Sequence, residues 1–141
     1  DHFKPINDTY GHSAGDEVLV EVAKRLMVSV RGLDLVARMG GEEFACILPD
    51  ISYERALDVA ERLRRVVGEK PFTIDVDGTK KDITVTTSIG GSYFDSREEV
   101  NGDKALQRAD SMLYAAKNSG RDQVIFEEGS GDQSRRLATQ E

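Results

Sequence analysis

Hydrophobic residues along residues 13–31 recur at a spacing that places them on one face of a helix. The apolar positions are Val18, Leu19, Val22, Ala23, Leu26, Met27 and Val30. Steps of three and four residues are typical of an amphipathic helix. Ser13 and Asp16 have the spacing of a capping box, so we expect the helix to begin at Ser13.

Two later segments show the same periodicity. One runs from Ser52, which can cap its N-terminus, to Val67, and Gly68 is expected to end it. The other spans residues 103–118. The inward faces are expected to consist of Ala56, Val59, Ala60, Leu63 and Val66 or Val67 in the first, and of Leu106, Ala109, Met112, Leu113 and Ala116 in the second.

Short alternating or β-branched runs between these segments predict strands. They occupy residues 35–39, 43–48, 72–76, 83–88 and 123–126. Asp77-Gly78 is the strongest short hairpin signal of the chain, so the strands on either side of it are expected to pair. Gly90-Gly91 interrupts the later strand and indicates a bulge.

Helices that alternate with hairpins favour the α+β class, with a central, mostly antiparallel sheet flanked by helices. The domain is expected to cover residues 1–126. Residues 127–141 are polar and without periodicity, so we expect a flexible tail there. The opening Asp1-His2-Phe3 is similar to the end of a strand whose body would lie upstream, and a loop is expected from Asn7 to the first helix.

The composition is that of one globular domain. The chain has 141 residues, 38% hydrophobic and 32% charged, so it can bury a core. The net charge of −7 argues against binding to nucleic-acid polymers or membrane surfaces, which need a basic face. The sequence has no apolar run of membrane-spanning length, and a cytoplasmic location fits the single cysteine, Cys46, which we expect in the core.

Gly40-Gly41-Glu42-Glu43 lies at the expected tip of the first hairpin. Glycine suits a tight turn and lets a ligand approach the backbone, while neighbouring carboxylates attract hard divalent ions such as magnesium. A solvated, charged turn would have the same sequence, so these residues alone leave both interpretations open.

Three other clusters have a functional and a purely structural interpretation. Asn7 and Asp16 offer an amide and a carboxylate that suit the edge of guanine, but both are also common turn and cap residues. Lys117 and Arg121 can clamp phosphates or complement a helix dipole. The third cluster is Arg31 and Asp34, which can hold a second guanine ligand or form a simple ion pair.

Several chemistries are excluded by the sequence. Two histidines and one cysteine are too few for a zinc site. The P-loop, nucleophile-elbow and protein-kinase signatures are missing from the sequence.

Four motifs stand in order along the chain: the opening segment from Asp1 to His12, Gly40 to Phe44, Arg108-Ala109-Asp110, and Tyr114-Ala115-Ala116-Lys117. Taken together, they resemble the GGDEF family of bacterial diguanylate cyclases over nearly all of residues 1–126, with Gly40 to Phe44 as the GGEEF form of the signature. The resemblance implies a fold like the palm of nucleotidyl cyclases and polymerases. It also implies that two GTP molecules are condensed into cyclic di-GMP, with release of pyrophosphate, by two domains that face each other in a homodimer.

Carried over position by position, the resemblance assigns roles to these residues. Glu42 would be a ligand of Mg²⁺ (or Mn²⁺), and Glu43 a second ligand or the group that helps to deprotonate the attacking hydroxyl. The implied substrate-binding residues are Asn7 and Asp16 for guanine, Gly40 and Gly41 for close approach of the nucleotide, and Lys4, Lys117 and Arg121 for the phosphates.

Arg31-Gly32-Leu33-Asp34 resembles the family's RxxD inhibitory site, five residues before the signature. Arg31 and Asp34 would bind the cyclic di-GMP product, with Arg62 of a neighbouring domain as a further contact. Bound product would then hold two domains in a nonproductive arrangement, which is feedback inhibition.

The chain departs from the family pattern at its start. The family opens with Asp-x-Asp-x-Phe-Lys, and its metal-ligand aspartate would lie two residues before Asp1. We therefore expect the native protein to continue upstream, with that strand and an N-terminal sensory or receiver module. The alternative is a chain that is badly folded and inactive. The alternative functions are a noncatalytic receptor for GTP or cyclic di-GMP, and a structural interaction module.

Overall fold

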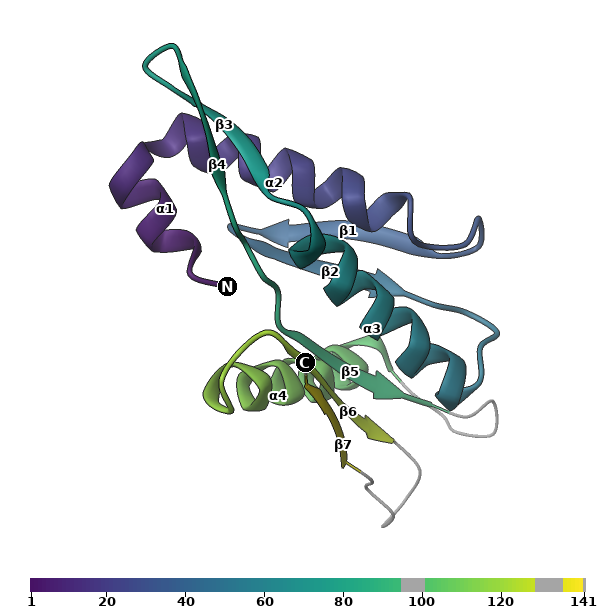
Figure 1. The fold of residues 1–141 in the computed structure, drawn as a ribbon. Helices are drawn as coiled ribbons and strands as arrows, with labels where there is room; N and C mark the ends of the chain where they lie inside the picture. Colours follow the sequence, from purple (N-terminus) through teal and green to yellow (C-terminus); the bar gives the residue numbers. More distant parts are fainter. Residues whose placement is uncertain (95–100, 129–135, 141) are drawn as a thin grey trace.

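The computed structural model describes residues 1–94, 101–128 and 136–140 of the chain. Helices and strands alternate along it, which confirms the α+β class (Figure 1). The elements are α1 (Phe3–Tyr10), α2 (His12–Met27), β1 (Leu35–Gly40), β2 (Glu43–Ile47), α3 (Tyr53–Glu69), β3 (Phe72–Val76), β4 (Thr79–Ile83), β5 (Ile89–Tyr93), α4 (Gly102–Asn118), β6 (Gln123–Glu128) and β7 (Arg136–Gln140).

Hydrogen bonding divides the strands into three small sheets. β1 pairs with β2 and β3 pairs with β4, both antiparallel. β6 pairs in parallel with β5 and antiparallel with β7. The pairing is mostly antiparallel, as the sequence predicted, but residues 84–88 connect β4 to β5 without forming a strand.

β6 is covered by helices on both sides, because its side chains alternate between the two faces of its sheet. Val124 and Phe126 pack towards α3, whereas Ile125 packs towards α4. Figure 1 shows α4 lying beside β5 and β6, in agreement with these contacts. The buried helix residues in these two clusters are Tyr53, Ala56 and Ala60 of α3, and Met112 and Ala116 of α4.

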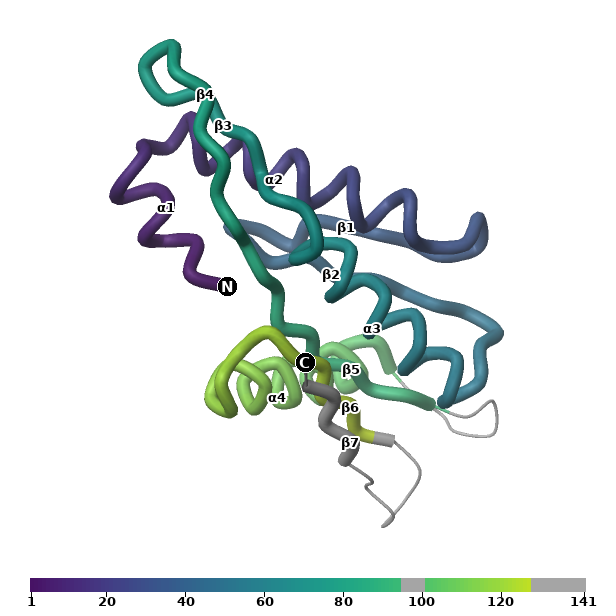
Figure 2. The backbone as a smooth tube through the Cα atoms, viewed as in Figure 1, coloured from purple at the N-terminus to yellow at the C-terminus, as the bar shows by residue number. Residues whose placement is uncertain are grey.

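The larger core lies between α2, α3 and β3. Since α3 contributes to this core and to the cluster around β6, it joins the two parts of the molecule, and Figure 2 shows it running between them. The buried members of the larger core are Ala14, Val18 and Leu26 of α2, Val59, Leu63 and Val67 of α3, Phe72 and Ile74 of β3, and Val85.

Residues 3–10 form a helix, where the sequence predicted the end of a strand and a loop. Phe3, Ile6 and Tyr10 are spaced as on one helical face and pack against the larger core. Pro5 stands in the first turn, where a proline is tolerated because its missing N–H has no helical partner. The prediction failed because this pattern spans little more than two turns.

The ends of α2 differ from the prediction. α2 begins at His12 with Gly11 as its N-cap, and no side chain caps it, so the predicted capping box of Ser13 is wrong. α1 ends where α2 begins, and the Gly11 N–H donates to the Asn7 carbonyl at 2.9 Å. At its other end α2 stops at Met27 instead of Arg31.

α3 begins as predicted, since Ser52 Oγ accepts a hydrogen bond from the Arg55 N–H at 3.2 Å. The predicted end at Gly68 is wrong, because α3 continues to Glu69. Arg25 of α2 satisfies the last carbonyls instead, donating to the Val67 oxygen at 2.8 Å and to the Lys70 oxygen at 2.7 Å.

The Asp77-Gly78 turn is confirmed, with φ of 51° and 83°. The second strand of this hairpin starts directly after the turn, at Thr79, because a two-residue turn leaves no room for a longer connection.

Gly90 and Gly91 lie in an unbroken parallel ladder with β6, so the predicted bulge is wrong. Instead of changing the register, both glycines allow a close approach of other groups. Gly90 faces the backbone of α4, and Gly91 faces the ring of Phe126.

Two further predictions are corrected. Cys46 is exposed, because its hairpin is covered by little of the described chain. The unstructured segment predicted from residue 127 is contradicted at residues 127–128, which belong to β6, and at Arg136–Gln140, which pairs with β6 as β7. Residues 129–135 and 141 of that segment lie outside the described residues.

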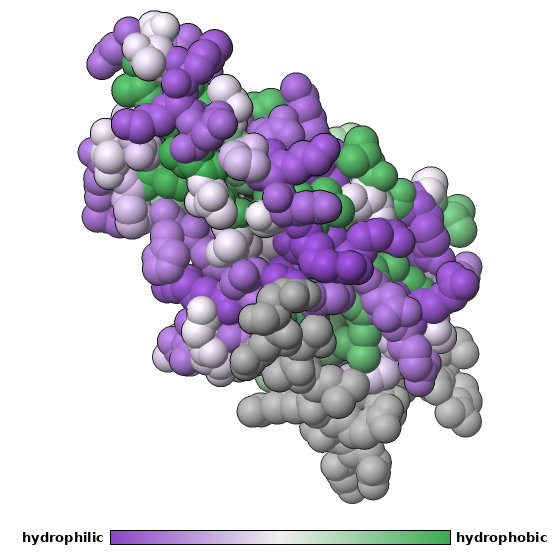
Figure 3. Space-filling model, viewed as in Figure 1, coloured by the Kyte–Doolittle hydropathy of each residue, from purple (hydrophilic) through white to green (hydrophobic). Residues whose placement is uncertain are grey.

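The face seen in Figure 3 is largely hydrophilic, with hydrophobic residues in small separate groups. Among the described helices, none combines the length and the apolar character needed to cross a bilayer.

Candidate nucleotide and metal site

The tip of the β1–β2 hairpin presents two carboxylates on a glycine turn. Gly40 and Gly41 have φ of 140° and 53°, in the region that favours glycine. The guanidinium of Arg38 donates two hydrogen bonds to the Gly41 carbonyl, at 2.9 and 2.6 Å, and so stabilises the turn. Glu42 and Glu43 are both exposed, so their carboxylates are accessible to a ligand.

The side chain of Asp1 is buried in a polar cage. The hydroxyls of Thr86 and Ser88 donate to its carboxylate at 2.9 and 2.6 Å, and the Asp122 N–H donates to it at 3.1 Å. A guanidinium nitrogen of Arg121 lies 3.7 Å from the same carboxylate. Asp1 therefore connects the start of the chain to the segment before β5 and to the loop between α4 and β6.

The loop after α4 lies against Asp1, since a guanidinium nitrogen of Arg121 is 3.7 Å from the Asp1 carboxylate. Lys117 precedes Arg121 by four residues, in the last turn of α4. The charges of Glu42, Lys117 and Arg121 all act on the first residue of the chain. One acidic group from the hairpin and two cations from α4 and its following loop thus act on one neighbourhood.

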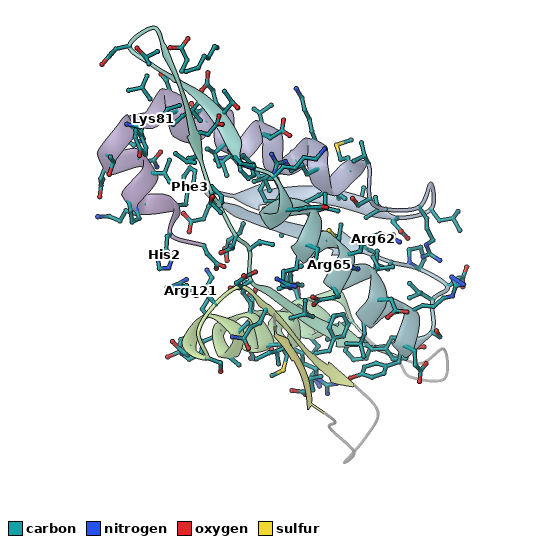
Figure 4. All side chains as sticks on the ribbon, in the orientation of Figure 1. His2, Phe3, Arg62, Arg65, Lys81 and Arg121 are labelled. Atoms are coloured by element: carbon teal, nitrogen blue, oxygen red, sulfur yellow. The ribbon has the colours of Figure 1, made fainter. Side chains whose placement is uncertain are left out.

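Lys117 and Arg121 reach this neighbourhood from different backbone conformations. Lys117 is in the last turn of α4, where it also complements the helix dipole. Arg121 has a left-handed φ of 65°, and its N–H donates to the Ala116 carbonyl at 3.0 Å. Figure 4 shows the Arg121 side chain close to His2, in agreement with its contact to Asp1.

Asn7 of α1 packs against Gly15 of α2, the residue before Asp16. The amide oxygen of Asn7 lies so near Gly15 that a Cβ there would be 1.8 Å from it. Gly15 directly precedes Asp16, which is exposed and lines a groove of about 720 Å³ between α2 and β3. Asn7 therefore lies against the residue that precedes Asp16 in α2.

Lys4 pairs with Asp8 of its own helix and not with the groups around Asp1. Its ammonium lies 3.5 Å from the carboxylate of Asp8, and its side chain is 86% exposed. An exposed pair of this kind contributes little to stability, so Lys4 is free to change partner when a phosphate is present.

Arg31 and Asp34 form a preorganised pair. The Arg31 guanidinium donates to both carboxylate oxygens of Asp34, at 2.6 to 3.1 Å, and to the Pro49 carbonyl at 2.6 Å. The Asp34 side chain is fully buried, and the hydrogen bond from Arg31 lowers the pKa of this carboxyl. Arg62 of the same chain donates to the Ser29 carbonyl at 2.6 Å, and its charge also lowers the pKa of Asp34.

Glu42 and Glu43 are exposed carboxylates of the hairpin tip that could hold a divalent metal ion. In the described part of the chain, no group of three or more His, Cys, Asp or Glu side chains is placed to hold a metal ion. Magnesium commonly uses only one or two protein carboxylates together with substrate phosphates, and Glu42 and Glu43 supply such a pair.

Sequence reasoning missed the partners of Asp1. Thr86 and Ser88 lie in a β-branched run that predicted only a strand, and Asp122 lies just after the motif residues. Since these contacts join residues 85 to 121 positions apart, no local pattern signals them.

Comparison with known proteins agrees with this geometry. The family model "Diguanylate cyclase, GGDEF domain" matches residues 1–123. The response regulator PleD of Caulobacter vibrioides is 48% identical over 125 residues, which are 89% of this chain and 27% of PleD. The chain thus spans about a quarter of the length of this relative.

Two solved structures resemble the fold closely. The GGDEF domain of DgcB from Caulobacter crescentus, in complex with c-di-GMP, has a TM-score of 0.80 and 35% identity, over 89% of this chain and 72% of that one. The active GGEEF domain of a diguanylate cyclase from Vibrio cholerae has a TM-score of 0.78 and 32% identity, over 89% and 76%. With its hairpin carboxylates, its cations in and just after α4 and a family match over most of its length, the chain belongs to the GGDEF family of diguanylate cyclase domains.

Proposed function

We propose that the chain is the catalytic domain of a diguanylate cyclase, which condenses two GTP molecules into cyclic di-GMP. The observations that carry the proposal are the exposed Glu42 and Glu43 on the glycine turn and the Arg121 guanidinium 3.7 Å from the buried Asp1 carboxylate. A nucleoside triphosphate with its divalent ion needs carboxylates and cations in one place. The similarity to a GGEEF domain described as active supports the proposal.

The reaction consists of two equivalent displacements. In each, the 3′-hydroxyl of one GTP attacks the α-phosphorus of the other, a phosphodiester bond forms, the α–β phosphoanhydride bond breaks and pyrophosphate leaves. Glu43 is the group proposed to help take the hydroxyl proton, and Glu42 and Glu43 would hold the ion. Mg²⁺ or Mn²⁺, when bound, lowers the pKa of the hydroxyl and neutralises the developing charge.

The remaining groups position the substrate. Asn7 and Asp16 recognise guanine through its hydrogen-bonding edge, and the packing of Asn7 against Gly15, the residue before Asp16, supports this role. Gly40 and Gly41 leave space for the nucleotide at the hairpin tip. Lys4, Lys117 and Arg121 neutralise the phosphates and orient the leaving pyrophosphate.

Each domain is proposed to bind one GTP, so that two domains must face each other in a homodimer. A monomer would then bind GTP without forming product. Regions of the protein outside this domain, such as a sensory or receiver module, would control the encounter of two domains in the cytoplasm.

Product inhibition is proposed at the Arg31–Asp34 pair. The buried Asp34 holds the Arg31 guanidinium in a fixed orientation, which suits bidentate recognition of a guanine edge or a phosphate. Arg62 lies beside this pair in the same chain and can also reach outward to product bound between domains. Arg31→Ala should abolish product inhibition and leave turnover intact, and unchanged inhibition would refute the assignment.

The main test measures cyclic di-GMP formation from GTP and Mg²⁺ by the full protein that the gene encodes. Glu42→Gln should reduce turnover to background, because an amide is a poor ligand of a hard cation. Glu69→Gln is the matched control, since Glu69 is an exposed carboxylate at the end of α3. Full activity of Glu42→Gln would overturn the metal assignment.

The alternative is a noncatalytic receptor that binds GTP or cyclic di-GMP and passes the signal to a partner. The preformed Arg31–Asp34 pair favours it, since binding of product there requires no chemistry. Binding of either nucleotide without product formation, in the same protein and buffer, would support the receptor.

A further inference from the structure

Arg64 is a buried cation that the proposed function does not use. It lies on α3, and its side chain is only 3% exposed. Its guanidinium donates to Glu61, which is three residues away on the same helix, and to the Asp122 carboxylate at 2.7 Å. A buried arginine with ion pairs is weak evidence for stability alone, since well-packed apolar residues often serve as well.

The residue that Arg64 reaches belongs to a turn of unusual conformation. Arg121 and Asp122 both have left-handed backbones, with φ of 65° and 46°. Non-glycine residues adopt this region only when the surroundings hold them there, and such residues often mark functional sites. The buried side chain of Gln123 contributes by donating to the carbonyls of Ser119 and Arg121 at 2.8 and 3.1 Å.

The same turn presents its groups to the site around Asp1. The Asp122 N–H donates to the Asp1 carboxylate, and the Arg121 guanidinium lies 3.7 Å from it. Asp122 thus has two contacts: its side chain accepts a hydrogen bond from Arg64 of α3, and its backbone N–H donates to Asp1. A displacement of the Asp122 side chain would move Arg121, because the two residues are adjacent.

We propose that Arg64 is a positioning residue for catalysis, which locks the Arg121–Asp122 turn from α3 and so holds the Arg121 guanidinium where the substrate phosphates bind. This inference rests on the proposed role of Arg121. Glu61 orients the Arg64 guanidinium through its contact within α3 and leaves one nitrogen directed at Asp122.

Steady-state kinetics of the full protein test the inference. Arg121→Ala should raise the KM for GTP by about tenfold or more, the usual effect of losing a charged hydrogen bond. Arg64→Met, which keeps the volume and removes the ion pair, should raise KM by at least about fivefold through the same group. Arg65→Met is the matched control on the adjacent, exposed arginine of α3, labelled in Figure 4, and should change KM less than about twofold.

The double variant separates positioning from general stability. If Arg64 acts through Arg121, then Arg64→Met should raise KM less than about twofold further when Arg121 is already alanine. Arg64→Lys keeps the charge and should restore part of the affinity. Independent, additive effects of the two substitutions, or an Arg64→Met variant that behaves like Arg65→Met, would overturn the inference.

Two further outcomes are decisive. If Arg64→Met does not fold, Asp122→Asn tests the link from its exposed end, because asparagine tolerates a left-handed backbone and removes only the charge. It should raise KM several-fold while Arg121 is present, and an unchanged KM would refute the link. An unchanged KM in Arg121→Ala would refute the phosphate role and the inference together. A raised KM in Arg121→Ala with an unchanged KM in Arg64→Met and Asp122→Asn would refute only the inference.

Discussion

Replacing Gly90 by alanine should displace α4 and with it the cations of the site. A Cβ at this position would lie 2.0 Å from the Leu113 nitrogen, 2.4 Å from the Ala109 oxygen and 2.6 Å from the Leu113 Cα. These are backbone atoms of α4, which cannot rotate away as the end of a long side chain can. Because real Cβ contacts stay beyond 3.0 Å, the helix must move by about 1 Å.

The size of the effect follows from this displacement. Overpacking a core with an added methyl group costs about 1–3 kcal/mol, and a clash with a helix backbone belongs at the upper end, near 3 kcal/mol. This is a large part of the roughly 5–15 kcal/mol that stabilises a domain, and it should lower the melting temperature by roughly 10 °C. Lys117 lies in the last turn of the displaced helix, so GTP turnover should fall as well.

The assay is urea unfolding followed by circular dichroism, with Gly102→Ala as the matched control. Gly102 is the first residue of α4, and nothing lies within 4 Å of a Cβ built on it. The control should be neutral or slightly stabilising, because alanine favours the helix and restricts the unfolded chain. Equal unfolding midpoints for Gly90→Ala and Gly102→Ala would refute the argument from close packing.

Three other substitutions test separate parts of the structure. Gly15→Ala should displace the Asn7 amide and weaken GTP binding more than it lowers stability. An unchanged affinity for GTP, measured by calorimetry, would show that Asn7 does not bind the guanine base. Arg25→Ala should lower the free energy of unfolding in urea by about 2–3 kcal/mol, because it removes hydrogen bonds to the last carbonyls of α3 and a guanidinium that lies 3.8 Å from the centre of the Phe72 ring. The control Lys24→Ala, at an exposed position of the same helix, should change it little. The lowered pKa of Asp34 means that its ionised form stabilises the fold above the ordinary carboxyl pKa near 4 and that this contribution disappears as pH falls through the lower folded value. The stability advantage of the native protein over Asp34→Asn should therefore be full at pH 6 and shrink in acid, and an advantage that grows in acid would contradict the sign.

The sequence by itself determined the elements whose signals are local. Helical spacing identified α3 and α4, the Ser52 hydroxyl capped α3 as predicted, and Asp77-Gly78 made the expected hairpin turn. The motif spacing also led to the correct family. These features depend on residues a few positions apart, where side-chain chemistry and backbone preference act directly.

The tertiary structure alone decided where distant residues meet. Asp1 is caged by residues 85 to 121 positions away, and the ion pair of Arg64 with Asp122 spans 58 positions. The sequence predicted that Gly90 interrupts a strand, whereas in the structure it lies within β5 and allows the backbone of α4 to approach closely. Such contacts depend on how whole helices and strands pack, and that packing is set by the combined fit of many side chains. No single stretch of sequence therefore predicts which distant residues meet.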